Sequence, residues 1–176
     1  MTRWMKYAVA SAILATAPVA ANAQETENRV AVKTDWSVYV EDNPTECWAV
    51  SAPRETVNTD ADGNIKAVRR GDIYMLVFYR PSESITGQIQ FAGGYPFAPG
   101  STVSVQIGDS KFDLFTEGES AWPATAAEDG KIIAAMKRGA DAVVTGRSAR
   151  GTVTKDTFSL LGFTAAVDEA QSRCAN

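Results

Sequence analysis

Hydrophobic and polar residues alternate along most of the chain, which is the pattern of half-buried β-strands. One stretch differs, because Ile73–Tyr79 is a nearly continuous apolar run between Gly71 and Pro81. Its short length and its β-branched and aromatic residues predict a buried central strand. The alternating pattern predicts further strands at residues 36–40, 47–52, 88–91, 102–107, 111–116, 142–148 and 152–160.

Two segments instead have the spacing of amphipathic helices. Thr125-Ala126-Ala127-Glu128 is a capping box at the start of the first helix, and Gly139 ends that helix. The second helix begins near Phe163. Its apolar positions fall on one helical face: Phe163, Ala166, Val167, Ala170 and Cys174.

Many short strands with turns between them, together with two amphipathic helices, predict a mainly β fold. We expect an antiparallel β-sandwich with two flanking α-helices, formed as a single domain by residues 35–176. Residues 24–34 are polar and lack periodicity, which indicates a flexible lead-in.

Residues 1–23 have the order of a secretory signal peptide. Arg3 and Lys6 are followed by the apolar run Tyr7–Ala17 and by Ala21-Asn22-Ala23, which fits signal peptidase cleavage. The alternative is a buried N-terminal helix. The apolar run is shorter than the roughly 20 residues that a transmembrane anchor needs. We therefore expect cleavage after Ala23, no transmembrane anchor after cleavage, and a periplasmic or extracellular protein.

The net charge of the chain after signal cleavage excludes one class of partner. Without Arg3 and Lys6, the 17 basic residues of the full chain fall to 15 against 21 acidic residues, a net charge of −6. Such a chain lacks the basic stripe that nucleic acid requires, so we expect no nucleic-acid partner.

The 2 cysteines, Cys47 and Cys174, predict one disulfide in an oxidising compartment; two free thiols are the alternative.

The sequence offers few means of catalysis or metal binding. It contains no histidine, the commonest general base and transition-metal ligand. Asn58–Ile65 resembles the first part of an EF-hand loop, but Arg69 stands where the bidentate glutamate belongs, which favours a simple turn. Gly118–Trp122 resembles half of a nucleophile elbow without a base. We predict no catalytic residue, no metal and no cofactor.

The candidate binding residues are Tyr95, Phe97, Arg69 and Arg70. Tyr95 and Phe97 lie in a loop bounded by glycine and proline, residues 93–100, where exposed aromatic rings would anchor a partner. The alternative is that both rings fill the end of the sandwich. The two arginines could clamp an anionic group, or they could lie at a solvated strand end where Arg70 contacts Asp72.

Four segments of the chain resemble one known family: Asp35-Trp36, Cys47-Trp48, Phe78–Pro81 and Thr157–Ala166. This is the invasion-associated locus B family, whose members are signal-bearing proteins of alphaproteobacteria. The resemblance extends from about Asp35 to Cys174. Many members have a further cysteine pair just before the first helix, and residues 115–123 of this chain have none. The resemblance implies export and supplies no catalytic residues.

Together these patterns predict a non-enzymatic binding protein of the bacterial envelope, with an envelope or host protein as its partner. Two alternatives stay open. One is a small hydrolase that uses a pair of carboxylates, and the other is a purely structural envelope protein.

Overall fold

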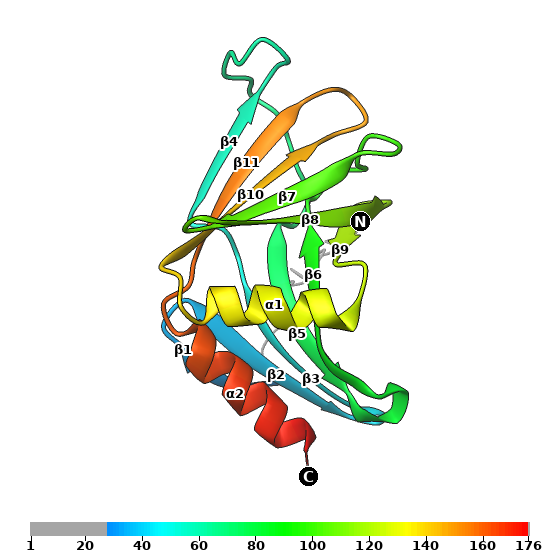
Figure 1. The fold of residues 1–176 in the computed structure, drawn as a ribbon, viewed down its shortest axis with the longest axis vertical. Helices are drawn as coiled ribbons and strands as arrows, with labels where there is room; N and C mark the ends of the chain where they lie inside the picture. Colours follow the sequence, from blue (N-terminus) through cyan, green and yellow to red (C-terminus); the bar gives the residue numbers. More distant parts are fainter. Residues whose placement is uncertain (1–27, 176) are drawn as a thin grey trace, which may run out of the picture.

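The fold is known from a computed structural model, which describes residues 28–175. Eleven strands form one antiparallel sheet in the order β1-β2-β3-β5-β6-β9-β8-β7-β10-β11-β4 (Figure 1). The strands are β1 (Arg29–Lys33), β2 (Trp36–Asp42), β3 (Thr45–Ser51), β4 (Glu55–Thr59), β5 (Tyr74–Arg80), β6 (Ile85–Ala92), β7 (Thr102–Ile107), β8 (Ser110–Glu117), β9 (Ser120–Trp122), β10 (Asp141–Arg147) and β11 (Val153–Ser159). The helices are α1 (Ala126–Met136), α2 (Phe163–Cys174) and the short 3₁₀ turn η2 (Pro81–Glu83).

The two layers of the fold are two halves of this one strongly bent sheet. Strands β1, β2, β3, β5 and β6 form the lower half in Figure 1, strands β8, β7, β10, β11 and β4 form the upper half, and β9 lies between them. Helix α1 crosses in front of the bend, and α2 lies against the lower half. The predicted mainly β fold with two flanking helices is confirmed. The predicted signal peptide lies outside the described residues.

One boundary predicted from the sequence is wrong. Strand β1 lies inside the segment 24–34, which was expected to be a flexible lead-in, so ordered structure begins before Asp35. The side chains of Val30 and Val32 are exposed, and only Ala31 of β1 packs against the core, so the backbone pairing with β2 is the main attachment of this strand. Hydrophobic periodicity reports burial, which explains why it does not reveal this strand.

The chain path creates a long crossover between the two halves. After β3 the chain leaves the lower half, adds β4 to the far edge of the upper half beside β11, and returns to β5 through residues 60–73. We call residues 60–73 the crossover segment.

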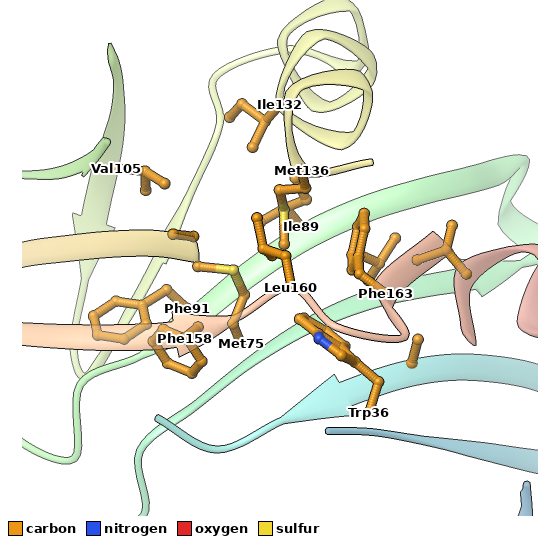
Figure 2. Close-up of a cluster of buried hydrophobic side chains, with 14 of the residues drawn as sticks. Trp36, Met75, Ile89, Phe91, Val105, Ile132, Met136, Phe158, Leu160 and Phe163 are labelled. Atoms are coloured by element: carbon orange, nitrogen blue, oxygen red, sulfur yellow. The ribbon is translucent and has the colours of Figure 1, made fainter. Parts of the chain in front are cut away.

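Side chains from both halves and both helices meet in one hydrophobic core (Figure 2). Phe91 of β6 meets the edge of Phe158 of β11, with 6.1 Å between ring centroids. Trp36 of β2 packs edge-on against Phe163 of α2 at 4.8 Å, and its indole N–H donates to the carbonyl of Ser159 at 2.9 Å. Buried apolar contacts therefore hold the two halves of the bent sheet together, and the buried indole N–H of Trp36 has a hydrogen-bond acceptor.

Both predicted helices are present, but two details of α1 differ: it ends at Met136 rather than at Gly139, and the Glu128 carboxylate caps the Ala124 amide rather than the Thr125 amide. The Thr125 hydroxyl accepts a hydrogen bond from the Glu128 amide, and the Glu128 carboxylate accepts one from the Ala124 amide. In α2 the predicted apolar face is buried, including Cys174. Cys174 forms a disulfide with Cys47 of β3, with 5.9 Å between the Cα atoms, so the predicted pairing is confirmed.

Candidate functional site

A pocket of about 580 Å³ opens where three segments meet. They are the crossover segment, the loop of residues 93–100 after β6, which we call the aromatic loop, and the β10–β11 turn of residues 148–152. The β10–β11 turn, orange in Figure 1, lies at the opposite end of the molecule from the C-terminus. Three of the four candidate binding residues, Arg69, Arg70 and Tyr95, line this pocket.

Phe97, the fourth candidate, belongs to the core. Its ring is 6% exposed, and its centroid lies 6.2 Å from that of Phe91. Its backbone is fixed by a hydrogen bond to the carbonyl of Gly118 at 2.9 Å and by a bridge to Ser148. Phe97 is therefore not an exposed anchor for a partner. Its ring fills the end of the fold, which was the alternative interpretation of the sequence.

Tyr95 stands between the core and the pocket. Its ring packs edge-on against Phe97 at 5.0 Å, and its hydroxyl lies 2.5 Å from the hydroxyl of Thr154. Gly146 makes room for it, since a Cβ there would lie 2.8 Å from the Tyr95 hydroxyl. Burial raises the pKa of Tyr95, while the hydrogen bond with Thr154 and the charge of Arg70 act in the opposite direction. Tyr95 is thus a neutral, half-buried wall of the pocket.

Arg70 is a buried anchor rather than a free cation. Its guanidinium donates to both carboxylate oxygens of Asp156 at 2.7 Å and to the carbonyl of Gly93, and it lies 4.9 Å from the centre of the Tyr95 ring. The side chains of Arg70 and Asp156 are 6% and 0% exposed. The expected contact of Arg70 with Asp72 at a solvated strand end is therefore wrong. The partner, Asp156, is 86 residues away in the sequence and becomes adjacent only through the crossover.

Arg69 behaves differently from its neighbour. It is exposed at the pocket, where Lys66 of the same segment and Arg150 of the β10–β11 turn also contribute to the lining. Within residues 28–175, none of these three cations forms an ion pair. Glu119 is the one carboxylate of the described residues that line the pocket. Sequence reasoning did not single out Lys66 or Arg150, because no spacing rule links two turns that meet only in the folded chain.

The remaining sequence motifs have local structural roles. The Asp60 carboxylate accepts hydrogen bonds from the amides of Asp62 and Asn64 and from the Asn64 side chain, and these bonds lower its pKa. The resemblance to an EF-hand loop therefore corresponds to a turn closed by Asp60. Residues 118–122, the half nucleophile elbow, form the turn before β9 and β9 itself. Among residues 28–175, neither helix is long and apolar enough to cross a membrane.

The model of one protein family, "Invasion associated locus B (IalB) protein", matches residues 36–171. The chain belongs to the IalB family. A crystal structure of invasion associated protein B from Bartonella henselae has a similar fold, with a TM-score of 0.57 at 12% sequence identity. That similarity covers 83% of this chain and 98% of the Bartonella chain. A search of curated proteins gives no match.

The family match agrees with the resemblance found in the sequence and extends over most of both sheet halves. It includes Arg69, Arg70 and Tyr95, together with the other two cations of the pocket, Lys66 and Arg150. At 12% identity the Bartonella structure supports the fold alone.

Proposed function

We propose that this IalB family protein is a non-enzymatic binding protein of the bacterial envelope, and that the pocket beside the aromatic loop is its ligand site. The observation that carries the proposal is the convergence of Arg69, Arg150 and Tyr95 from three separate segments on one pocket. A volume of about 580 Å³ lies within the range of roughly 300–1,000 Å³ that small-molecule sites have.

The build of the pocket also favours binding. Its floor is held by the buried pair of Arg70 and Asp156 and by the hydroxyl contact of Tyr95 with Thr154. Contact residues that are fixed before the ligand arrives lose little conformational entropy on binding. Export to the envelope is supported by the order of basic, apolar and small residues in segment 1–23.

The alternative of a carboxylate-dependent hydrolase has less support. Glycoside hydrolysis uses two carboxyl groups about 5–10 Å apart, one on each side of the scissile bond. Of the described residues, Glu119 is the single carboxylate at this pocket, and Asp129 is the single one at a second pocket of about 400 Å³ beside α1. Asp129 accepts a hydrogen bond from the Ile89 amide, which occupies one of its oxygens.

The test compares capture by two variants that carry the same change of charge. The pocket variant is Lys66→Gln, Arg69→Gln, Arg150→Gln. The control variant is Lys111→Gln, Lys131→Gln, Lys155→Gln, whose three cations are exposed, form no ion pair within the described residues and lie outside the pocket lining. Each tagged mature protein is incubated with the envelope fraction of its own bacterium, and the bound molecules are compared by mass spectrometry.

We expect the wild-type protein and the control variant to retain the same molecules and the pocket variant to lose them. Equal retention by all three proteins would contradict the assignment of the pocket. N-terminal sequencing of the native protein checks the proposed export, because an intact Met1 would contradict cleavage after Ala23.

A further inference from the structure

The cations of the pocket are not balanced by the residues around them. Arg70 is neutralised by Asp156, which leaves Lys66, Arg69 and Arg150 opposite the single carboxylate of Glu119. The mature chain as a whole has a net charge of −6 after loss of Arg3 and Lys6. The pocket is therefore a local region of positive potential on an acidic protein, and such regions concentrate anions.

Backbone hydrogen bonds fix the segments that carry these cations. The Lys66 amide donates to the Asn58 carbonyl at 2.8 Å, and the Gly71 amide donates to the Gly94 carbonyl at 2.8 Å. On the other side, the Ala149 amide donates to the Pro96 carbonyl at 2.9 Å, so the β10–β11 turn is attached to the aromatic loop. The three cationic side chains thus extend from anchored backbone and line the same pocket.

We propose that the pocket binds a small ligand with two or more oxyanion groups, either carboxylates or phosphates. This inference rests on the proposed function and specifies its ligand. Cations from separate segments of the pocket lining can contact separate anionic groups of one molecule, and Arg69 and Arg150 can each hold such a group through two N–H donors. The half-buried face of Tyr95 and the adjacent Pro96 would contact the carbon skeleton or the ester part of the ligand.

A small ligand fits better than an extended polyanion. The pocket lining ends within a few residues in each segment, and the excess negative charge of the mature chain repels a long polyanion that continues past the pocket. A compact molecule with several anionic groups meets the three cations without this repulsion.

The experiment uses isothermal titration calorimetry on the mature protein with two probes, citrate for carboxylates and pyrophosphate for phosphates. We expect saturable one-site binding of at least one probe to the wild-type protein and to the control variant Lys111→Gln, Lys131→Gln, Lys155→Gln. For the pocket variant we expect binding weaker by at least about tenfold, because lost charge-assisted hydrogen bonds weaken binding by about that factor or more. Added NaCl should weaken wild-type binding through screening of the exposed charges.

Two results would overturn the inference. One is the absence of saturable binding of either probe at concentrations up to about 10 mM, which corresponds to less than about 3 kcal/mol of binding free energy. The other is equal binding by the pocket and control variants, which would place any bound anion elsewhere on the surface. Circular dichroism of each variant verifies that it is folded.

The outcome is separable from that of the proposed function. If capture from the envelope depends on the pocket while neither probe binds, the binding function stands and the oxyanion class is wrong. If a probe binds at the pocket while envelope capture does not depend on it, the oxyanion site stands and the proposed role in capture is wrong. Preference for citrate or for pyrophosphate distinguishes the two sources of negative charge.

Discussion

At the scale of single residues, Gly162 occupies a position that has no room for a side chain. Its φ of +88° lies in the left-handed region, and a Cβ there would lie 1.8 Å from the carbonyl oxygen of Lys33. This close approach places the end of β1 against the residue that caps α2. Gly162 also belongs to the segment Thr157–Ala166, one of the four segments that resemble the family.

We expect Gly162→Ala to lower the free energy of unfolding by clearly more than the roughly 1–2 kcal/mol that a left-handed alanine alone costs. The matched control is Gly151→Ala. Its φ is +81°, but nothing lies within 4 Å of the added Cβ, so it measures the conformational cost without the clash. Urea denaturation of both variants gives the comparison. Equal losses would show that β1 moves aside at little cost.

The candidate site was predictable to the extent that its residues carry a local signal. The glycine and proline around Tyr95 and the pair Arg69-Arg70 attract attention in the sequence, and all three of these residues line the pocket. Their roles were not predictable, because they depend on distant partners. Arg70 is neutralised by Asp156, and Arg69 gains its cationic neighbour Arg150 only when the crossover segment reaches the β10–β11 turn.

At the scale of elements, Asp129 attaches α1 to β6. Its carboxylate accepts a hydrogen bond from the Ile89 amide at 2.8 Å, and the residue is 5% exposed. Burial raises the pKa of Asp129 above its ordinary value of 3.8; the Ile89 hydrogen bond opposes this effect, and the nearby charge of Glu128 adds to it. A carboxyl whose pKa is raised in the folded state favours folding when protonated, so its contribution is lost as pH rises through the folded pKa.

We therefore expect Asp129→Asn to gain stability relative to the wild-type protein as pH rises from about 3 through the raised pKa of Asp129. The asparagine oxygen can still accept from the Ile89 amide and carries no charge to desolvate. Asp129→Ala is the control that removes the acceptor, and it should be about 1–3 kcal/mol less stable than Asp129→Asn at every pH, because the buried amide is left unpaired. Urea denaturation between pH 3 and pH 7 measures both. A constant difference between Asp129→Asn and wild type across this range would contradict the assignment of the titrating group.

The elements that were predictable from the sequence are those whose signals lie within a short stretch of chain. Hairpins such as β10–β11 and the capped helix α1 have their periodicity, turns and caps within a short stretch of chain. Strands β1, β4 and β9 have little or no apolar alternation, and each is held by pairing with a neighbour. The joining of the two halves into one sheet also has no sequence signal, since it depends on the pairing of the short strand β9 with both β6 and β8.

At the scale of the whole molecule, the disulfide and the candidate site lie far apart. The disulfide joins β3 to the end of α2, near the C-terminus, and the β10–β11 turn that lines the pocket lies at the other end of the molecule (Figure 1). Between them lies the core shared by both halves, in which Phe91 meets Phe158 and Trp36 meets Phe163. Because this core is continuous, stability gained at one end supports the arrangement of segments at the other.

The disulfide should make a large contribution to this stability. Its cysteines are 127 residues apart, so in the chain-entropy description it restricts most of the unfolded chain, with an effect of about 4–5 kcal/mol. We expect Cys47→Ala, Cys174→Ala to unfold at a lower urea concentration than the oxidised wild-type protein. A reducing agent should shift the wild-type transition toward that of the double variant and leave the variant unchanged. This internal control separates loss of the bond from loss of the two buried sulfur atoms, because reduction breaks the bond and keeps both atoms in place. Coincident transitions of oxidised and reduced wild-type protein would show that the other contacts of α2 are sufficient to hold it, including its buried face of Phe163, Ala166 and Val167, and that the disulfide adds no measurable stability.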